Sequence, residues 1–251
     1  MNRTIATVLG AAFLLAVAGP AKSDGLHIFD ATLGESKSPA PDISTAQMRQ
    51  ILAEGSAIVI DTRPHDQYDA GHLPDAHVVD GSHEQRMAAI ERLLKGNKNG
   101  SLVLYCNGPY CKASKRFADE LIASGFNNVK RYQLGIPVWR ALGGPTVVEL
   151  AGIKRIFGVD RTAVFIDARP TDEFAKGSLR GAHSLPVDDL RSGKLKKLPL
   201  PLDDFNRRVV LFGRDGAQAR KLADMLSKRP WHNVAYFPGR YEELAAALKR
   251  K

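Results

Sequence analysis

The sequence predicts an α/β protein made of two tandem domains, each a small parallel sheet with helices on both faces. One observation is an internal repeat, because residues 58–64 (IVIDTRP) return as residues 164–170 (VFIDARP). Another is the alternation of short apolar runs with helical patterns in each half, which is typical of parallel sheets. The third is the length of 251 residues, which suits one or two domains.

Short apolar runs identify the expected strands. Runs of about four to eight such residues between turn signals are consistent with strands buried in a parallel sheet. The expected strands are Ala57–Ile60, Leu102–Tyr105, Val129–Leu134, Ala163–Ile166, Val209–Phe212 and Val234–Phe237.

Helix signals fall between these runs. Ser44 is a suitable N-cap for a helix that runs to about Leu52 and ends at Gly55. A second helix follows residues 102–105 and ends before Gly125, and its counterpart follows residues 209–212. We therefore expect the same order of elements in both halves.

The N-terminus has the pattern of a secretory signal peptide. Arg3 precedes an uncharged apolar stretch, Ile5–Ala18, which is followed by small residues. The stretch is shorter than the roughly 20 residues that span a bilayer. We therefore predict cleavage near residue 23, no membrane span after cleavage, and a periplasmic or secreted location.

The expected domain boundaries follow from the repeat and the linker signals. Residues 1–23 are the signal peptide and residues 24–42 a leader or linker rich in Ser and Pro. Residues 43–145 form the first domain and residues 146–251 the second, with the boundary near Gly143-Gly144-Pro145.

The formal net charge of +9 lies entirely after residue 150. A basic surface attracts anions, membranes or nucleic acid. Export argues against nucleic acid, and no aromatic residues are interleaved with the small cluster of Lys194, Lys196 and Lys197. We interpret this charge as a solvated basic face of the second domain.

The candidate reactive residues lie in the segment after residues 102–105. Cys106 follows the expected strand directly, and a loop and a helix come next. Ligands bind at the carboxyl ends of parallel strands, and loop amides with a helix N-terminus attract anions. The same positive end lowers a thiol pKa, so Cys106 is the candidate nucleophile. The candidate substrate-binding residues are Asn107, Gly108, Pro109, Tyr110, Cys111, Lys112 and Arg63.

These motifs resemble the rhodanese superfamily, twice over. Residues 61–76 (DTRPHDQYDAGHLPDA) are similar to the family pattern D-V-R-x-x-x-E-Y-x-x-G-H-I-P-G-A. Cys106 falls at the family's catalytic position, and residues 135–139 (GIPVW) resemble its closing glycine-to-tryptophan segment. The resemblance covers about residues 43–248.

The resemblance implies sulfur transfer without a metal or organic cofactor. The Cys106 thiolate would attack the outer sulfur of thiosulfate or of another sulfane donor, and sulfite would leave a cysteine persulfide. A thiol or cyanide would then accept the sulfur. Arg63 would orient the loop through an ion pair.

The first repeat departs from the family in its loop. The loop is longer than usual, lacks the common arginine, and carries Gln67 where Glu is frequent. Cys111 adds a second thiol to the loop. This thiol could attack a persulfide on Cys106, which would form a disulfide and release sulfide. It could equally form a disulfide with Cys106 that locks the loop. A purely structural disulfide and a thiol–disulfide redox pair remain alternatives.

The second repeat has no nucleophile. Gly213 stands at the cysteine position, and Ser178 and Arg180 replace the family's His and Pro. We expect an inactive domain that binds another exported protein or contributes structure, and an anion cradle that survives near Arg214. A non-enzymatic sulfur carrier is therefore a further alternative.

Two other site classes are disfavoured. The spacing from Cys106 to Lys112 has the length of a phosphatase loop, but lysine lacks the planar fork of arginine. His65, His72, His77 and His83 do not have helical metal-ligand spacing, and His72 belongs to the family pattern. We expect no metal site.

Overall fold

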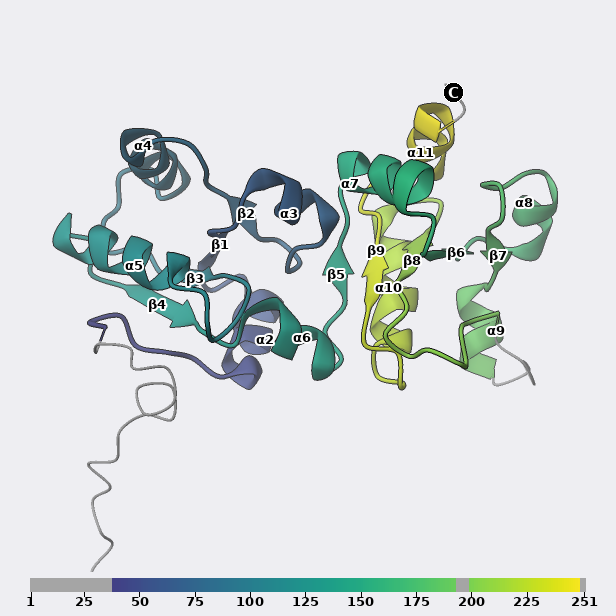
Figure 1. Ribbon diagram of the computed structural model, residues 1–251, viewed down its shortest axis with the longest axis horizontal. Helices are drawn as coiled ribbons and strands as arrows, with labels where there is room; N and C mark the ends of the chain where they lie inside the picture. The colour runs from purple at the N-terminus through teal and green to yellow at the C-terminus, as the bar shows by residue number, and fades with distance from the viewer. Residues whose placement is uncertain (1–37, 193–198, 249–251) are drawn as a thin grey trace, which may run out of the picture. The chain divides into compact units, whose positions relative to one another are not determined.

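The structure is a computed structural model, and it describes residues 38–192 and 199–248. Its elements alternate in the predicted order (Figure 1). In the first half they are α2 (Thr45–Glu54), β1 (Ile58–Asp61), α3 (His65–Ala70), β2 (His77–Val78), α4 (His83–Leu93), β3 (Leu102–Tyr105), α5 (Ala113–Ala123), β4 (Val129–Tyr132) and α6 (Gly135–Ala141). In the second half they are β5 (Thr146–Val147), α7 (Leu150–Arg155), a π-helical segment (Ile156–Asp160), β6 (Val164–Asp167), α8 (Thr171–Ala175), β7 (His183–Ser184), α9 (Val187–Ser192), β8 (Val209–Phe212), α10 (Gly216–Leu226), β9 (Val234–Tyr236) and α11 (Tyr241–Leu248).

The first sheet is parallel throughout, with strand order β2-β1-β3-β4. Its register places Asp61 of β1 opposite Tyr105 of β3, and Tyr105 opposite Tyr132 of β4. The three strands therefore end level with one another. Their carboxyl ends form one edge of the sheet, which is where parallel sheets present functional groups.

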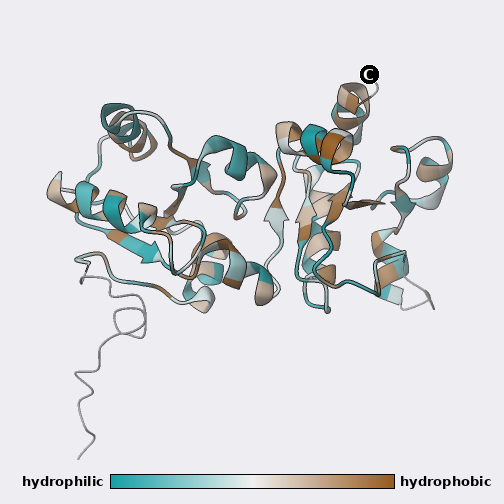
Figure 2. Cartoon of the chain, viewed as in Figure 1, coloured by the Kyte–Doolittle hydropathy of each residue, from teal (hydrophilic) through white to brown (hydrophobic). Residues whose placement is uncertain are grey.

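Alternate residues of the first sheet enter two apolar layers, because side chains in a strand point to opposite faces. One layer joins β1 and β3 to α4 and α5 through Ile60, Leu102, Leu104, Ile90, Phe117 and Leu121. The other joins the same strands to α2 and α6 through Val59, Val103, Tyr105, Met48, Ile136 and Trp139. The outward sides of α4 and α5 are mostly hydrophilic (Figure 2).

The second sheet repeats this plan and adds a strand, in the order β5-β9-β8-β6-β7. One layer joins it to α9 and α10 through Ile166, Val209, Leu211, Leu190, Leu222 and Leu226. The other joins it to α7, the π-helical segment and α11 through Phe165, Val210, Phe212, Ile153, Ile156 and Leu244. The predicted α/β fold with two parallel sheets and helices on both faces is confirmed.

Strand and helix predictions from buried runs and caps agree well with the structure. The strands at residues 102–105 and 209–212 have the predicted bounds. Ser44 caps α2 in a capping box with Gln47, and Gly55 ends the helix in a left-handed conformation. Two-residue strands β2 and β7 were not predicted, because two residues show no periodicity.

Strand β5 belongs to the second sheet and also contacts the first half of the chain. It pairs in parallel with β9, while Val147 forms an antiparallel bridge with His72. Gly152 of α7 lies so close to the first half that a Cβ atom there would be 2.1 Å from the carbonyl oxygen of Asp69. The expected linker at residues 143–145 is packed as well, since Trp139 Nε1 donates to the Pro145 carbonyl at 2.9 Å.

The end of the expected leader is also packed against the first sheet. Ala40 is buried in the layer that contains α4 and α5. Asp42 forms a parallel bridge with Arg131 of β4, and the Arg131 amide donates to the Pro41 carbonyl. Residues 38–42 therefore behave as an extension of the sheet and not as a free linker.

Some predictions concern residues outside the described ranges. The signal peptide, the leader up to residue 37 and the Lys194, Lys196 and Lys197 cluster are among them. Among the helices that the structure describes, none combines the length and apolar character needed to cross a membrane.

Candidate active site

The candidate nucleophile lies in the loop between β3 and α5. Strand β3 is buried along its whole length and ends at Tyr105, while α5 begins at Ala113. Cys106 is the first residue beyond the strand and is 3% exposed. Cys111, at the other end of the loop, is half-buried. A disulfide joins the two cysteines across a Cα–Cα distance of 6.1 Å.

Helix α6 supports this loop through its first residue, Gly135. A Cβ atom at Gly135 would lie 2.3 Å from the Cys106 carbonyl oxygen and 2.4 Å from the Gly108 nitrogen. The backbone of Gly135 is also left-handed, with φ of 60°. The next amide, that of Ile136, donates to the Cys106 carbonyl at 3.3 Å. Only glycine satisfies both the close approach and the backbone conformation.

A buried ion pair supports the loop from β1. Arg63 donates to Asp61 through Nε and Nη2, with Nη2 and Oδ2 2.6 Å apart, and the two side chains are 5% and 0% exposed. Nη2 also donates to the Gly71 carbonyl at 2.7 Å, and Nη1 to Asn107 Oδ1 at 3.4 Å. The guanidinium is thereby engaged with the protein, and it orients Asn107 at the start of the loop.

Burial and the neighbouring charge shift the pKa of Arg63 and of the tyrosine beside it. Burial disfavours the charge of Arg63, but the hydrogen bond and the charge of Asp61 outweigh burial and raise the pKa of Arg63. Burial, followed by the charge of Asp61, raises the pKa of Tyr105 well above its usual range. Tyr105 therefore stays protonated, donates to Asp61 Oδ2 at 2.6 Å and accepts from the Leu73 amide at 3.1 Å.

Amide side chains anchor the rest of the loop. Asn107 Nδ2 donates to Gln67 Oε1 at 2.7 Å, which gives the unexpected glutamine of the first repeat a contact with the loop. Gln133 Nε2 donates to the Pro109 carbonyl at 2.7 Å, and the buried guanidinium of Arg131 donates to Gln133. The loop is therefore held from β4 as well as from β1.

The tip of the loop is its accessible part. The Cys111 amide donates to the Gly108 carbonyl at 2.9 Å, and Gly108 is left-handed with φ of 106°. This tight turn presents Tyr110, which is 86% exposed. Lys112 is also exposed and occupies the N-cap of α5 without a side-chain capping bond. An approaching molecule would meet Tyr110 and Lys112 first.

Ser114 in the first turn of α5 is a feature that the sequence reasoning missed. It is 1% exposed, and its hydroxyl has no hydrogen-bond partner among the described residues. Buried hydroxyls without a partner are uncommon. The signal that could have found it is the second repeat, where the matching buried position holds Ala219, which has no hydroxyl.

Comparison of the two repeats shows how the loop after β3 differs in length from the loop after β8. Helices α5 and α10 each bury residues at the same spacing, beginning with Ser114 and Phe117 in one and Ala219 and Leu222 in the other. The preceding strands end at residues 105 and 212. The first loop is therefore two residues longer than the second, and the extra length includes the segment that carries Cys111.

The corresponding loop of the second repeat is closed by its own side chains. Asp215 Oδ1 accepts from the Gln218 amide at 2.8 Å and caps α10, while the Arg214 amide donates to Gln218 Oε1 at 2.8 Å. The Arg214 side chain pairs with Glu173. A carboxylate at a positive helix end occupies the place of an external anion. The expected anion cradle near Arg214 is therefore already filled.

The second repeat keeps the buried ion pair but satisfies it differently. Arg169 Nη2 lies 2.7 Å from Asp167 Oδ2, as in the first repeat. Phe212 stands where the first repeat has Tyr105 and offers no hydroxyl. Ser178 Oγ donates to Asp167 Oδ2 at 2.7 Å instead. The Ser178 hydroxyl therefore supplies to Asp167 the hydrogen bond that the Tyr105 hydroxyl supplies to Asp61 in the first repeat.

His65 and His72 of the first repeat form hydrogen bonds with different partners. His72 stacks on Tyr68 at a centroid distance of 3.8 Å, and its Nε2 lies 3.1 Å from Glu149 Oε1. His65 lies 3.2 Å from Asp80. Within residues 38–192 and 199–248, no group of three or more His, Cys, Asp or Glu side chains is placed to hold a metal ion.

Comparisons with known proteins match both repeats. The family model of the rhodanese-like domain matches residues 44–142 and 153–247. A putative mitochondrial thiosulfate sulfurtransferase of Schizosaccharomyces pombe is 27% identical over 104 residues, which are 37% of this chain and 70% of that protein.

Other similar proteins carry names that do not refer to sulfur transfer. The HTH-type transcriptional regulator Rv0324 of Mycobacterium tuberculosis is 30% identical over 108 residues, covering 43% of this chain and 45% of that protein. A tRNA uridine(34) hydroxylase of Photorhabdus laumondii is 27% identical over 116 residues, covering 45% of this chain and 31% of that protein. The chain spans less than half the length of these two relatives.

Proposed function

The chain belongs to the rhodanese-like domain family, with two copies of the domain in tandem, and from this premise we propose that it is a sulfurtransferase that carries sulfane sulfur on Cys106. The observation that supports the proposal most is the place of Cys106. It is the first residue after a central parallel strand, and the loop that follows leads into the N-terminus of α5. Such a position favours a thiolate and anionic ligands.

The proposed reaction has two displacement steps. The Cys106 thiolate attacks the outer sulfur of thiosulfate, a new S–S bond forms, and sulfite leaves with the electron pair of the old one. A thiolate or cyanide then attacks the outer sulfur of the persulfide, and the Cys106 thiolate leaves. Thiosulfate, or another persulfide donor, and a thiol or cyanide acceptor are the proposed partners, and no metal or organic cofactor takes part.

The disulfide means that this reaction needs the reduced chain. A nucleophilic thiol reduces a disulfide by attacking one of its sulfurs. Cys111 is more exposed than Cys106, so we propose that attack falls on Cys111 and releases the Cys106 thiolate. A dithiol reductant would then complete the reduction by forming its own disulfide.

The disulfide also favours a second candidate function, a thiol–disulfide redox protein that uses Cys106 and Cys111. The two functions are chemically linked. The Cys111 thiol can attack the persulfide on Cys106, which gives the disulfide and releases hydrosulfide. In this case sulfur reduction, and not sulfur delivery, would be the outcome.

A pair of serine variants separates these functions. We expect reduced chain with thiosulfate and cyanide to form thiocyanate, Cys106→Ser to form none, and Cys111→Ser to keep or increase the rate. We also expect the reduced chain, freed of added thiol and given thiosulfate alone, to release sulfide in a single turnover only when both cysteines are present. Thiocyanate formation by Cys106→Ser at the unchanged rate would refute the first function, and sulfide release by Cys111→Ser at the unchanged rate would refute the second.

We further propose that the protein is exported, on the strength of the N-terminal sequence alone. Arg3, the apolar stretch 5–18 and the small residues after it support cleavage near residue 23. N-terminal sequencing of the protein from the periplasm or medium tests this. An intact Met1 on protein found only in the cytoplasm would contradict it.

A further inference from the structure

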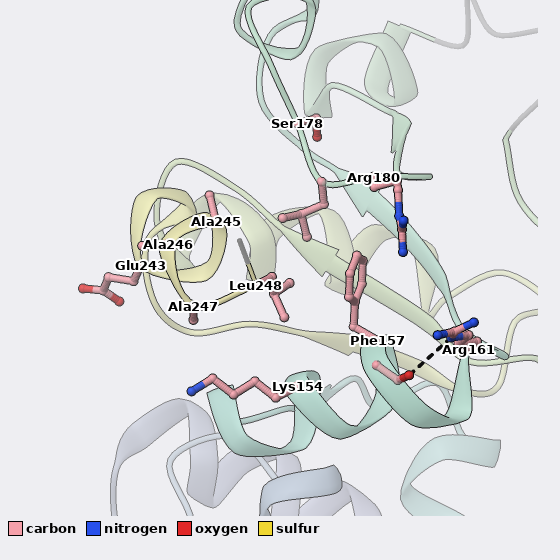
Figure 3. A pocket seen from close by; sticks show the side chains of 12 residues that line it. Lys154, Phe157, Arg161, Ser178, Arg180, Glu243, Ala245, Ala246, Ala247 and Leu248 are labelled. Atoms are coloured by element: carbon pink, nitrogen blue, oxygen red, sulfur yellow. Dashed lines mark hydrogen bonds between the residues drawn. The ribbon is translucent and has the colours of Figure 1, made fainter. Parts of the chain in front are cut away.

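The second domain has a hollow on its surface. Its volume is about 960 Å³. It lies between α11, the end of α7 with the π-helical segment, and the chain from Ser178 to Arg180, as the labelled side chains in Figure 3 show. Apolar groups of Phe157, Leu179 and Leu248 line it together with three basic side chains. These basic side chains are Lys154, Arg161 and Arg180.

The internal repeat shows which part of the first domain corresponds to this hollow. Gly71 and Gly177 match, because each carbonyl accepts from the buried arginine of its own domain at 2.7 and 2.8 Å. His72 therefore corresponds to Ser178. Helix α6 follows β4 as α11 follows β9, so the two helices correspond as well.

In the first domain this place is filled by the chain that leaves α6. The His72 amide donates to the Val147 carbonyl at 3.0 Å, and the Val147 amide donates back to the His72 carbonyl at 2.9 Å. Two residues further on, the Glu149 carboxylate lies 3.1 Å from His72 Nε2. The occupant is thus an extended segment that pairs with the backbone and ends in an acidic side chain.

In the second domain the matching groups are unpaired. The main-chain N–H and C=O of Ser178 have no hydrogen-bond partner among the residues that the structure describes. The side chains of Lys154 and Arg180 likewise have no ion-pair or hydrogen-bond partner within those ranges. Glu243 is the acidic residue of the lining, and its carboxylate points away from the other side chains in Figure 3.

Charge indicates what kind of segment fits. The walls of the hollow carry three cations against one carboxylate. The sequence after Leu248 is Lys249-Arg250-Lys251, which has the same charge as the walls and would be repelled by them. An acidic segment is favoured, in keeping with Glu149 in the first domain.

We propose that this hollow binds an extended, acidic segment of another protein. The segment pairs its main chain with Ser178, as edge-strand recognition does. It places an apolar side chain against Phe157 and Leu179, and an acidic side chain two residues later faces Arg180 and Arg161. The proposal goes beyond sulfur transfer and does not depend on Cys106. It gives the domain without a cysteine a binding role.

The chain itself supplies the probe, a fluorescent peptide with the sequence of residues 142–150 (LGGPTVVEL). Fluorescence polarisation at low salt should show saturable binding to the intact protein. Replacing the valine at the Val147 position by N-methylvaline removes the donor of the backbone pair and should weaken binding at least about tenfold. A peptide with Lys at the Glu149 position should lose a similar factor.

Variants of the protein give the matched controls. Arg180→Glu should weaken binding at least about tenfold, because it turns an attraction into a repulsion. Lys221→Glu changes charge equally at an exposed position of α10 outside the hollow, and should change binding less than about twofold. Thiocyanate formation should be the same in both variants, which separates this test from that of the proposed function.

Three outcomes would overturn the proposal. The first is no saturable binding of the probe. The second is equal binding of the N-methylated and unmodified peptides. The third is displacement of the peptide by dodecanoate at a lower concentration than unlabelled peptide requires, since this would indicate a site for amphipathic small molecules.

Discussion

At the scale of single residues, the loop of Cys106 depends on groups that hold it from below. Gly135 lets the backbone of α6 approach the Cys106 carbonyl, and Arg63 connects Asp61 to Asn107. The sequence singled out Arg63 and the closing glycine because both belong to motifs that resemble the family pattern, and an ion pair that orients the loop was what the resemblance implied for Arg63. It did not predict the buried Ser114 hydroxyl, since a serine at the start of a helix has ordinary structural uses.

Gly135→Ala tests the support of the loop. A methyl group would collide with backbone atoms of Cys106 and Gly108, so we expect a loss of at least about 3 kcal/mol of unfolding free energy. Displacement of the loop should lower thiocyanate formation by about a hundredfold in the fraction that folds. Urea unfolding and the thiocyanate assay measure the two effects.

Gly55→Ala is the matched control. Gly55 has the same φ of 60° but no atom within 4 Å of a Cβ position. It should cost only the roughly 1–2 kcal/mol of a left-handed backbone and leave the rate unchanged. Equal effects of the two substitutions on stability and rate would contradict the close contact at Gly135.

At the scale of elements, the two strand–loop–helix units show which strands and helices the sequence patterns can predict. Residues 102–105 and 209–212 were predicted with their observed bounds, because strands buried on both faces are apolar at every position. Strand β5 and the π-helical segment could not be predicted. Two residues carry no periodicity, and a π-helical segment of five residues is about one turn, too short to show a period different from that of the α-helix it continues.

The loops of these units differ in a way that the sequence shows only partly. The absence of cysteine at Gly213 is plain from the sequence. The capping of α10 by the Asp215 carboxylate is a matter of geometry, because an aspartate near a helix start either caps it or points to solvent. The observed cap makes the second loop a poor site for an anion.

Gly213→Cys therefore should not create a second active site. The new thiol would lie beside a shorter loop whose helix end already holds the Asp215 carboxylate, which repels thiosulfate. With Cys106→Ser in the background, we expect no measurable thiocyanate from Gly213→Cys. Adding Asp215→Asn removes the negative charge and should raise labelling of the new thiol by anionic alkylating reagents.

The reagent comparison provides the check on this explanation. A neutral reagent should label both forms of the Gly213→Cys chain at similar rates, while an anionic reagent should favour the Asp215→Asn form. Wild-type-like thiocyanate formation by the chain with Cys106→Ser and Gly213→Cys, without Asp215→Asn, would show that the cap does not exclude the anion.

At the scale of the whole molecule, the two repeats are joined by specific contacts. Strand β5 pairs with β9 and also bridges to His72, and Arg220 Nη1 lies 3.3 Å from Asp75 Oδ2. The repeat in the sequence predicted two domains of one kind. It could not predict how they are joined, because these contacts involve single residues that form no pattern.

Tyr236 lies near the contact between Arg220 and Asp75, and the pH dependence of the unfolding free energy tests its surroundings. Burial raises the pKa of Tyr236 to about 12, Arg220 opposes this and Asp75 adds to it. In an unfolded chain the pKa of tyrosine is about 10. The folded state therefore holds the phenolic proton more tightly, and the resulting stability is complete below about pH 10 and is lost as pH rises through about 12.

Tyr236→Phe removes this proton linkage. Between about pH 9 and about pH 11, the wild-type chain should lose about 1.4 kcal/mol of unfolding free energy relative to Tyr236→Phe. Urea unfolding at both pH values gives the difference. A constant difference, or one of opposite sign, would show that the phenol is not buried as described.

The central claim is that Cys106 carries the transferred sulfur, and mass spectrometry of the Cys111→Ser chain tests it most directly. The reduced variant is incubated with thiosulfate, separated from it and digested without reductant. A gain of about 32 Da on the peptide that contains Cys106, lost on addition of cyanide, is the predicted result. An unmodified Cys106 under conditions in which the same sample still forms thiocyanate would contradict the account.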